Sequence, residues 1–317
     1  MQFTNIIVLS TLFSSLATAV DVKGIFDEEA LRKKYAPLYQ TKIVQHTDGS
    51  LSFDKARLFR KDGINVLYMK GDQFEMAYQH GVLLKDQIAD GAAIQSSKLI
   101  PNTVKNAVGD GLVAGAVAFG IDRFIAQPML DHTIAASPVN REAFVAAFAL
   151  SEATGIPAET FVDGLLAPEI LMLLAKLSMQ FGEFPTNVGG AANNCTAFTV
   201  WGQYSKNGEM IIGRNLDFPL TSKFDKHTTL LYFDSTDGGQ KYLSIASAGT
   251  HNVPITAINE SGIYIALHTL PTPETSAEAV PLFLTGGKVL RNATTFDEAV
   301  AMFKAEPAPT GWTYDLI

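Results

Sequence analysis

The sequence predicts an α+β protein in which a mainly helical segment precedes an antiparallel sheet and further helix follows the sheet. Two observations support this prediction. Residues 21 to about 190 carry apolar residues at three- and four-residue spacings, which is the period of a helix, whereas from Cys195 onward the period is two, which is that of a strand. A stretch typical of a loop, GEFPTNVGGAANN at residues 182–194, separates the two halves.

Composition limits the class of protein. The chain has 317 residues, of which 47% are apolar and 18% charged, and this suits a globular core rather than disorder or a coiled coil. The net charge of -8 argues against nucleic acid as the main partner, because phosphate binding needs a basic face. The single cysteine, Cys195, excludes an internal disulfide.

The N-terminal segment resembles a secretory signal. Residues 3–19 read FTNIIVLSTLFSSLATA, an apolar stretch that ends in a small-residue cleavage pattern and is too short for a membrane-spanning helix. No Lys or Arg precedes the apolar stretch, and a buried N-terminal helix is the alternative. We expect a signal peptide at residues 1–19, and therefore a secreted, lysosomal or periplasmic protein.

The first half is expected to be mainly helical, with one strand at residues 64–69. The apolar runs 161–181 and 111–121 are interrupted or short, so they predict core helices or helices that touch a membrane, not spanning ones. The expected helices lie at residues 27–39, 74–90, 141–150 and 161–181.

The second half is expected to form three hairpins followed by two helices. Asn207-Gly208 is typical of a tight two-residue turn, because both residues tolerate positive φ. The expected strands lie at residues 195–201, 209–215, 228–234, 241–247, 255–258 and 263–268, and the helices at 282–292 and 295–304.

Cys195 has two interpretations, a small buried apolar residue or a nucleophile. It begins the first strand of the sheet half, directly after the loop. Cleavage before Cys195 would place the thiol and a new α-amino group, whose ordinary pKa is about 7.7–8.0, on one residue. That is the N-terminal nucleophile arrangement, in which the amine takes the thiol proton.

Arg214 and Asp217 follow Cys195 in the sequence by 19 and 22 residues, and their charges are of the kind that supports a nucleophilic thiol. A cation stabilises a thiolate and a carboxylate orients an ammonium, although an exposed ion pair is the simpler interpretation. With a turn at residues 207–208, Trp201 lies opposite Arg214 and Phe198 opposite Asp217. Arg214 then shares a sheet face with Cys195 at about 20 Å. A bulge or bend would be needed to bring both side chains to the thiol.

Six short segments resemble one known family. They read NCTAF (194–198), GRNLDF (213–218), GDQFEMAYQHG (71–81), NESGI (259–263), and VLR with TFDEA (289–291 and 295–299). Together they resemble the N-terminal nucleophile cysteine hydrolases, the group of penicillin V acylase, bile salt hydrolase, acid ceramidase and the acyl-CoA:6-aminopenicillanic acid acyltransferase. The similarity spans residues 64–317.

This resemblance implies a four-layer αββα sandwich and self-cleavage between Asn194 and Cys195. Residues 20–194 would form a mainly helical pro-segment that stays bound, and residues 195–317 the catalytic part. Arg214 and Asp217 match the family's catalytic arginine and aspartate. The oxyanion-binding position falls at or next to His268, where relatives usually carry asparagine or tyrosine. The family continues with strands beyond residue 317, so we expect the chain to be C-terminally incomplete.

The expected function is a secreted, self-cleaving cysteine amidase that hydrolyses linear non-peptide amides through an acyl-enzyme on Cys195. Two alternatives share the fold: an acyltransferase that passes the acyl group to an amine, and a catalytically silent binding protein. The expected partners are a small-molecule or lipid N-acyl amide, the protein's own pro-segment, and a membrane contacted peripherally. The histidines show no metal-ligand spacing, so neither a metal nor a cofactor is expected.

Overall fold

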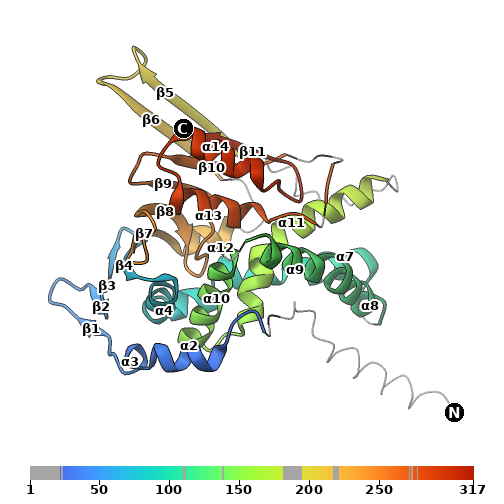
Figure 1. The fold of residues 1–317 in the computed structure, drawn as a ribbon, viewed down its shortest axis with the longest axis horizontal. Helices are drawn as coiled ribbons and strands as arrows, with labels where there is room; N and C mark the ends of the chain where they lie inside the picture. The colour runs from blue at the N-terminus through green and yellow to red at the C-terminus, as the bar shows by residue number, and fades with distance from the viewer. Residues whose placement is uncertain are drawn as a thin grey trace.

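Helices pack against one large, mostly antiparallel sheet, and this arrangement confirms the predicted α+β class (Figure 1). The computed structural model describes residues 22, 24–109, 112–137, 139–180, 195–216, 221–270, 272, 274–276 and 278–317. The expected signal segment 1–19, the loop 182–194 with Asn194, and Asp217 lie outside the described residues.

Within the described residues, the main sheet has nine strands in the order β1-β2-β3-β4-β7-β8-β9-β10-β11. Neighbouring strands are antiparallel, apart from the parallel pair β4 and β7. The strands are β1 (Val44–Gln45), β2 (Leu51–Phe53), β3 (Ala56–Lys61), β4 (Ile64–Gly71), β7 (Thr228–Ser235), β8 (Tyr242–Ser247), β9 (Thr256–Asn259), β10 (Tyr264–Thr269) and β11 (Trp312–Leu316). A separate hairpin contains β5 (Thr196–Gly202) and β6 (Gly208–Asn215).

The parallel pair β4–β7 joins the two halves of the chain into one sheet, with residues 65–71 beside residues 229–235. Leu67 and Met69 on β4, and Leu231 and Phe233 on β7, are at most 1% exposed, so this junction lies in the core. The strand predicted at residues 64–69 is confirmed as β4. The short strands β1 to β3 were not predicted, because they are partly exposed and their apolar alternation is weak.

The predicted helices are present, with shifted ends and breaks. The helix expected at residues 74–90 is divided at Leu84 into α4 and α5, and the one expected at 282–292 is α13. The helices are α2 (Glu28–Lys34), α3 (Ala36–Tyr39), α4 (Gln73–Leu83), α5 (Lys85–Ala89), α6 (Ala92–Ser97), α7 (Leu99–Val108), α8 (Leu112–Ile121), the π-helix η1 (Asp122–Ala126), α9 (Gln127–Ala136), α10 (Asn140–Thr154), α11 (Ala158–Gln180), α12 (Thr221–Lys226), α13 (Leu282–Asn292) and α14 (Phe296–Ala305).

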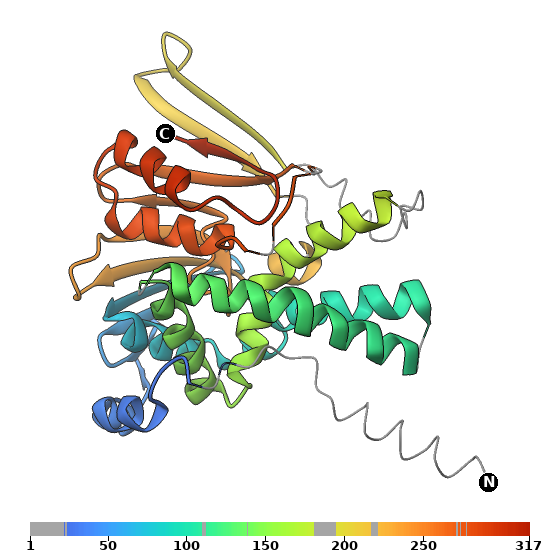
Figure 2. The same ribbon diagram turned by 45° about the vertical axis from the view of Figure 1, so that its right-hand side comes forward.

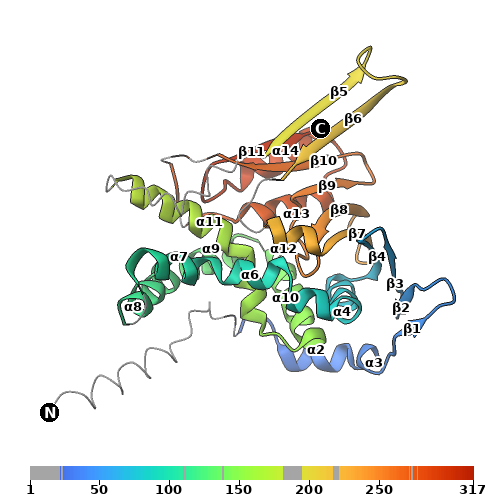
Figure 3. The ribbon, with the colours of Figure 1, turned by 180° about the vertical axis from the view of Figure 1, so that it is seen from behind.

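Some helices lie along the strands of the sheet, and others extend away from it. Figure 2 shows α13 and α14 lying along the C-terminal strands, where Phe303 of α14 packs on Tyr314 of β11. The helices α7, α8 and α9 extend to one end of the molecule, and the β5–β6 hairpin projects beyond the main sheet in every view (Figure 3). The space bounded by α6, α10, α11 and the start of the hairpin contains the candidate site described below.

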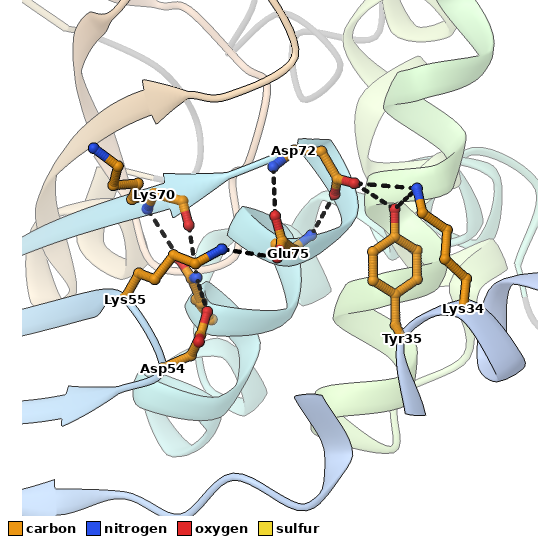
Figure 4. A network of polar contacts seen from close by, with 8 residues as sticks. Lys34, Tyr35, Asp54, Lys55, Lys70, Asp72 and Glu75 are labelled. Carbon is orange, nitrogen blue, oxygen red and sulfur yellow. Dashed lines mark hydrogen bonds and ion pairs between the residues drawn. The ribbon is translucent and has the colours of Figure 1, made fainter. Parts of the chain in front are cut away.

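The segment 71–81 begins α4, and its polar side chains mostly have structural partners (Figure 4). The Asp72 carboxylate accepts from the backbone N–H of Glu75 at 3.0 Å, and the Glu75 carboxylate accepts from that of Asp72 at 2.9 Å, which is a capping box. Asp72 also accepts a hydrogen bond from the Tyr35 hydroxyl. Gln79 both donates to and accepts from the backbone of Lys70. This segment therefore fixes how α4 leaves β4.

Among the described residues, no helix is long and apolar enough to span a membrane. In α11, Leu166 and Ile170 are at most 2% exposed, and Glu169 on the same helix is fully buried. The part of α11 with described side chains is therefore a core helix.

Candidate active site

Cys195 and Arg214 meet at the open end of the β5–β6 hairpin. Cys195 immediately precedes β5, and Arg214 lies on β6 directly opposite Ala197. Because residues two apart on a strand share a face, Arg214 and Cys195 project from the same face of the hairpin. The Nη2 atom of Arg214 donates to the Sγ atom of Cys195 at 3.2 Å. The hairpin thus brings a guanidinium to the one thiol of the chain.

The hairpin register predicted from the sequence, with Trp201 opposite Arg214, is wrong. The connecting loop contains residues 203–207, so Asn207-Gly208 does not form a two-residue turn. The pairing also shifts between Val200 and Gly202. These two features move Arg214 four positions along β5, from Trp201 to Ala197, and replace the expected separation of about 20 Å by direct contact.

Arg214 also connects the hairpin to the main sheet. Its Nη2 atom donates a hydrogen bond to the backbone carbonyl of Leu267 on β10. Leu267 is 2% exposed, and its own N–H donates to the carbonyl of Ile255. The carbonyl that accepts from Arg214 therefore belongs to a residue fixed within the sheet. One guanidinium nitrogen therefore contacts both the thiol and the sheet, and this fixes where the thiol lies.

The thiol faces a large apolar pocket with about 1040 Å³ of empty space, part of it open to solvent. Its walls come from α6, α10 and α11 on one side and from β10, the loop after β8, and α13 on the other. Cys195 and Arg214 line it together with Leu267 and Thr269. Most of the remaining wall is aliphatic or aromatic, including Ala147, Leu150, Phe161, Val162, Leu165, Ile255, Phe283 and Trp312. Such a pocket suits an apolar ligand with one reactive polar group.

His268 is placed away from this pocket. Its Nε2 atom lies 3.0 Å from an oxygen of Asp315, across the β10–β11 pair, whereas its neighbours Leu267 and Thr269 line the pocket. Strand alternation explains this, because successive side chains point to opposite faces. The structure therefore brings Cys195 and Arg214 together but not the His268 side chain. A contribution from the His268 backbone stays a prediction.

Glu169 binds Trp312, a residue of the pocket wall, and was not among the predicted site residues. This fully buried carboxylate accepts from the backbone N–H of Leu282 at 2.9 Å, from the Thr310 hydroxyl at 2.6 Å and from the indole N–H of Trp312 at about 3.0 Å. Burial raises its pKa above the ordinary value, against the effect of these donors. Its sequence signal is a carboxylate inside the otherwise apolar stretch 164–175 of α11.

His80 and His251 form a buried pair beside the same pocket. Their Nδ1 atoms lie 3.1 Å apart, and the N–H of Gly249 donates to Nε2 of His80 at 3.1 Å. Burial lowers the pKa of His80 to about 3 and that of His251 well below its ordinary value. This geometry is that of a packed, structural histidine pair. Within the described residues, no group of three or more side chains is arranged to hold a metal ion.

The chain is similar to one curated protein, "Protein dcd1B" of Dictyostelium discoideum. The two are 22% identical over 188 residues, which covers 56% of this chain and 33% of the Dictyostelium protein. The match thus spans about a third of the length of that relative. No family model matches the chain.

Proposed function

We propose that this protein is a secreted cysteine amidohydrolase of the N-terminal nucleophile class, which cleaves linear N-acyl amides after self-cleavage between Asn194 and Cys195. The observation that supports this most directly is the 3.2 Å contact between Arg214 and the Cys195 thiol at the wall of an apolar pocket. A lone buried thiol needs no arginine beside it, whereas a nucleophile gains from one.

Self-cleavage supplies the base that the intact chain lacks. The freed α-amino group of Cys195 takes the thiol proton while Sγ bonds to the substrate carbonyl carbon. The carbon–nitrogen bond then breaks, the amine leaves with that proton, and a thioester remains. Water hydrolyses the thioester and regenerates the thiol. Arg214 holds Sγ in place through its second bond to the Leu267 carbonyl.

The substrate class follows from the pocket. Aliphatic and aromatic side chains on α10 and α11 favour an extended acyl chain, and the reacting carbonyl would lie at Cys195 and Arg214. Both helices precede the proposed cleavage site, so the pro-segment has to stay bound for the pocket to persist. The strand pairing of β4 with β7 supports this, because it crosses the same division of the chain.

A four-layer αββα sandwich is part of the proposal. The main sheet with α13 and α14 along it supplies two of the layers, and the β5–β6 hairpin would belong to the second sheet. The hairpin exposes large apolar side chains, with Phe198 at 58% and Trp201 at 59%, as expected of a surface that packs on another layer.

Intact mass measurement and N-terminal sequencing of the purified chain test the proposal. We expect a fragment of residues 195–317 that begins Cys-Thr-Ala-Phe, and release of free fatty acid from an N-acyl amide. Cys195→Ala should abolish both, whereas Ser205→Ala in the hairpin loop, the matched control, should retain both. An uncut wild-type chain that releases no acid would contradict the proposal. A new amide formed with an added amine would identify the acyltransferase alternative.

A further inference from the structure

A second, smaller pocket adjoins the apolar one and differs from it in chemistry. It has about 350 Å³ of empty space and shares three wall residues with the first pocket: Ala143, Asn252 and Phe283. Besides the shared Asn252, its polar lining residues are Gln73, Asn140, Glu142, Lys288 and Arg291. Cys195 and Arg214 line only the first pocket, so the polar pocket lies away from the thiol.

Two of its side chains are buried with unused hydrogen-bonding atoms. Gln73 is 4% exposed, and neither its Oε1 nor its Nε2 has a partner. The Arg291 side chain is 10% exposed, and its Nε and Nη1 atoms are likewise unpartnered. Buried polar groups are nearly always hydrogen-bonded, because an unpaired one has lost its bonds to water and gained none in return. Four such atoms from α4 and α13 around one pocket indicate a place for a polar ligand group.

The segment 71–81 strengthens this point. Asp72, Glu75 and Gln79 bond to the protein around the start of α4, and His80 bonds to Gly249. Gln73 belongs to the same segment, but its side-chain amide makes no hydrogen bond to the protein. It is therefore available for a ligand.

The charges around the pocket favour a neutral group. Nη2 of Arg291 lies 3.0 Å from Asp237 and 3.3 Å from Glu142, and the Lys288 ammonium lies 2.6 Å from Glu306. Both cations thus already face carboxylates, and an added charge would lack a counter-ion. A carboxamide or hydroxyl group, which both donates and accepts, matches the free atoms of Gln73 and Arg291.

We propose that the Gln73–Arg291 pocket binds a neutral polar group, a carboxamide or a hydroxyl, at the end of the substrate remote from the scissile carbonyl. This inference deepens the proposed function and rests on it for the placement of the rest of the substrate in the apolar pocket. The preferred substrates are therefore N-acyl amides with a second, uncharged polar group, rather than purely apolar chains.

Binding of two matched probes to the full-length Cys195→Ala protein tests the assignment without requiring catalysis. The two probes differ only at the end remote from their amide: N-methyl-8-hydroxyoctanamide offers a donor and an acceptor there, whereas N-methyl-8-methoxyoctanamide offers only an acceptor. By calorimetry we expect the hydroxyl probe to bind about fivefold more tightly, because its hydroxyl donates one hydrogen bond that the methoxy group cannot donate. Adding Gln73→Leu, which removes the acceptor for that hydroxyl, should reduce the preference to about twofold or less, whereas Arg291→Lys should weaken the binding of both probes. Gln40→Leu, at an exposed position, is the matched control and should keep the preference.

Thermal unfolding separates a ligand role from a structural one. Gln73→Leu replaces an unpartnered amide by an apolar group, so the free protein should be at least as stable as its parent. Loss of stability in Gln73→Leu, or a preference for the hydroxyl probe that survives Gln73→Leu, would overturn the assignment. Absence of binding by either probe would overturn it as well. Failure of the proposed function would be seen separately, as an intact wild-type chain without amidase activity.

Discussion

The Leu267 carbonyl on β10 accepts a hydrogen bond from Arg214 on β6, and the same Arg214 nitrogen contacts Cys195. This bond is a polar link between the projecting hairpin and the main sheet. It means that the position of the thiol depends on β10, a strand more than fifty residues away in the sequence. A change at Arg214 should therefore affect geometry as well as charge.

Arg214→Lys tests this dependence. Lysine keeps the positive charge but has a single ammonium on a flexible stem, which does not hold the thiol and the Leu267 carbonyl in one fixed geometry. We expect kcat/KM for an N-acyl amide to fall by about a hundredfold or more, from lost positioning of the nucleophile. Arg57→Lys, at the exposed ion pair with Asp48, is the control. Turnover in Arg214→Lys within about threefold of wild type would contradict the role given to the guanidinium.

Ala147→Phe tests the use of the apolar pocket. Ala147 on α10 lines the pocket and is 6% exposed, so a ring at this position takes up space that an acyl chain would occupy. We expect kcat/KM to fall about tenfold or more for long acyl chains and to change little for short ones, since overpacking hinders only the ligand that reaches the ring. The same substitution at the exposed Ala116 on α8 provides the control. An unchanged chain-length profile would place the acyl chain elsewhere.

Local sequence patterns predicted the elements but not the contacts that build the site. The helix at residues 282–292 and the strand at 64–69 were predictable because their apolar periods are regular. The hairpin register was not, since it depends on the five-residue loop 203–207 and on the irregularity between Val200 and Gly202, which no apolar period reveals. Glu169 was missed because its donors lie 113 to 143 residues away. Periodicity carries no information on such long-range pairs.

Glu169→Leu and Glu169→Gln test the buried carboxylate. Leucine leaves the donors of Leu282, Thr310 and Trp312 without their acceptor, so we expect a loss of at least about 2 kcal/mol in the free energy of unfolding. Glutamine keeps one acceptor oxygen, so Glu169→Gln should lower the free energy of unfolding by less than Glu169→Leu at neutral pH.

Because the pKa of Glu169 is raised, the difference in stability between wild type and Glu169→Gln should depend on pH. Because burial holds its pKa above the ordinary 4.5, the stability that it contributes is complete below that pH and is lost as pH rises through the folded-state pKa. Denaturant unfolding from pH 4 upward should show wild type losing stability relative to Glu169→Gln. A constant difference between the two curves would mean that the pKa of Glu169 is not raised.

His80 should produce the opposite dependence on pH. Burial lowers its pKa from 6.5 to about 3, so its contribution is complete above pH 6.5 and is lost as pH falls toward 3, because protonation is favoured only in the unfolded chain. We expect His80→Gln to lower the free energy of unfolding by about 1–2 kcal/mol at neutral pH, because the His80 bonds to Gly249 and His251 are lost. The variant should also lose less stability than wild type as the pH falls. Denaturant unfolding at several pH values between 7 and 4 measures both effects, with the exposed His132→Gln as the matched control. If the curves of His80→Gln and wild type stay parallel throughout, the buried pair does not bind protons on unfolding and its role is packing alone.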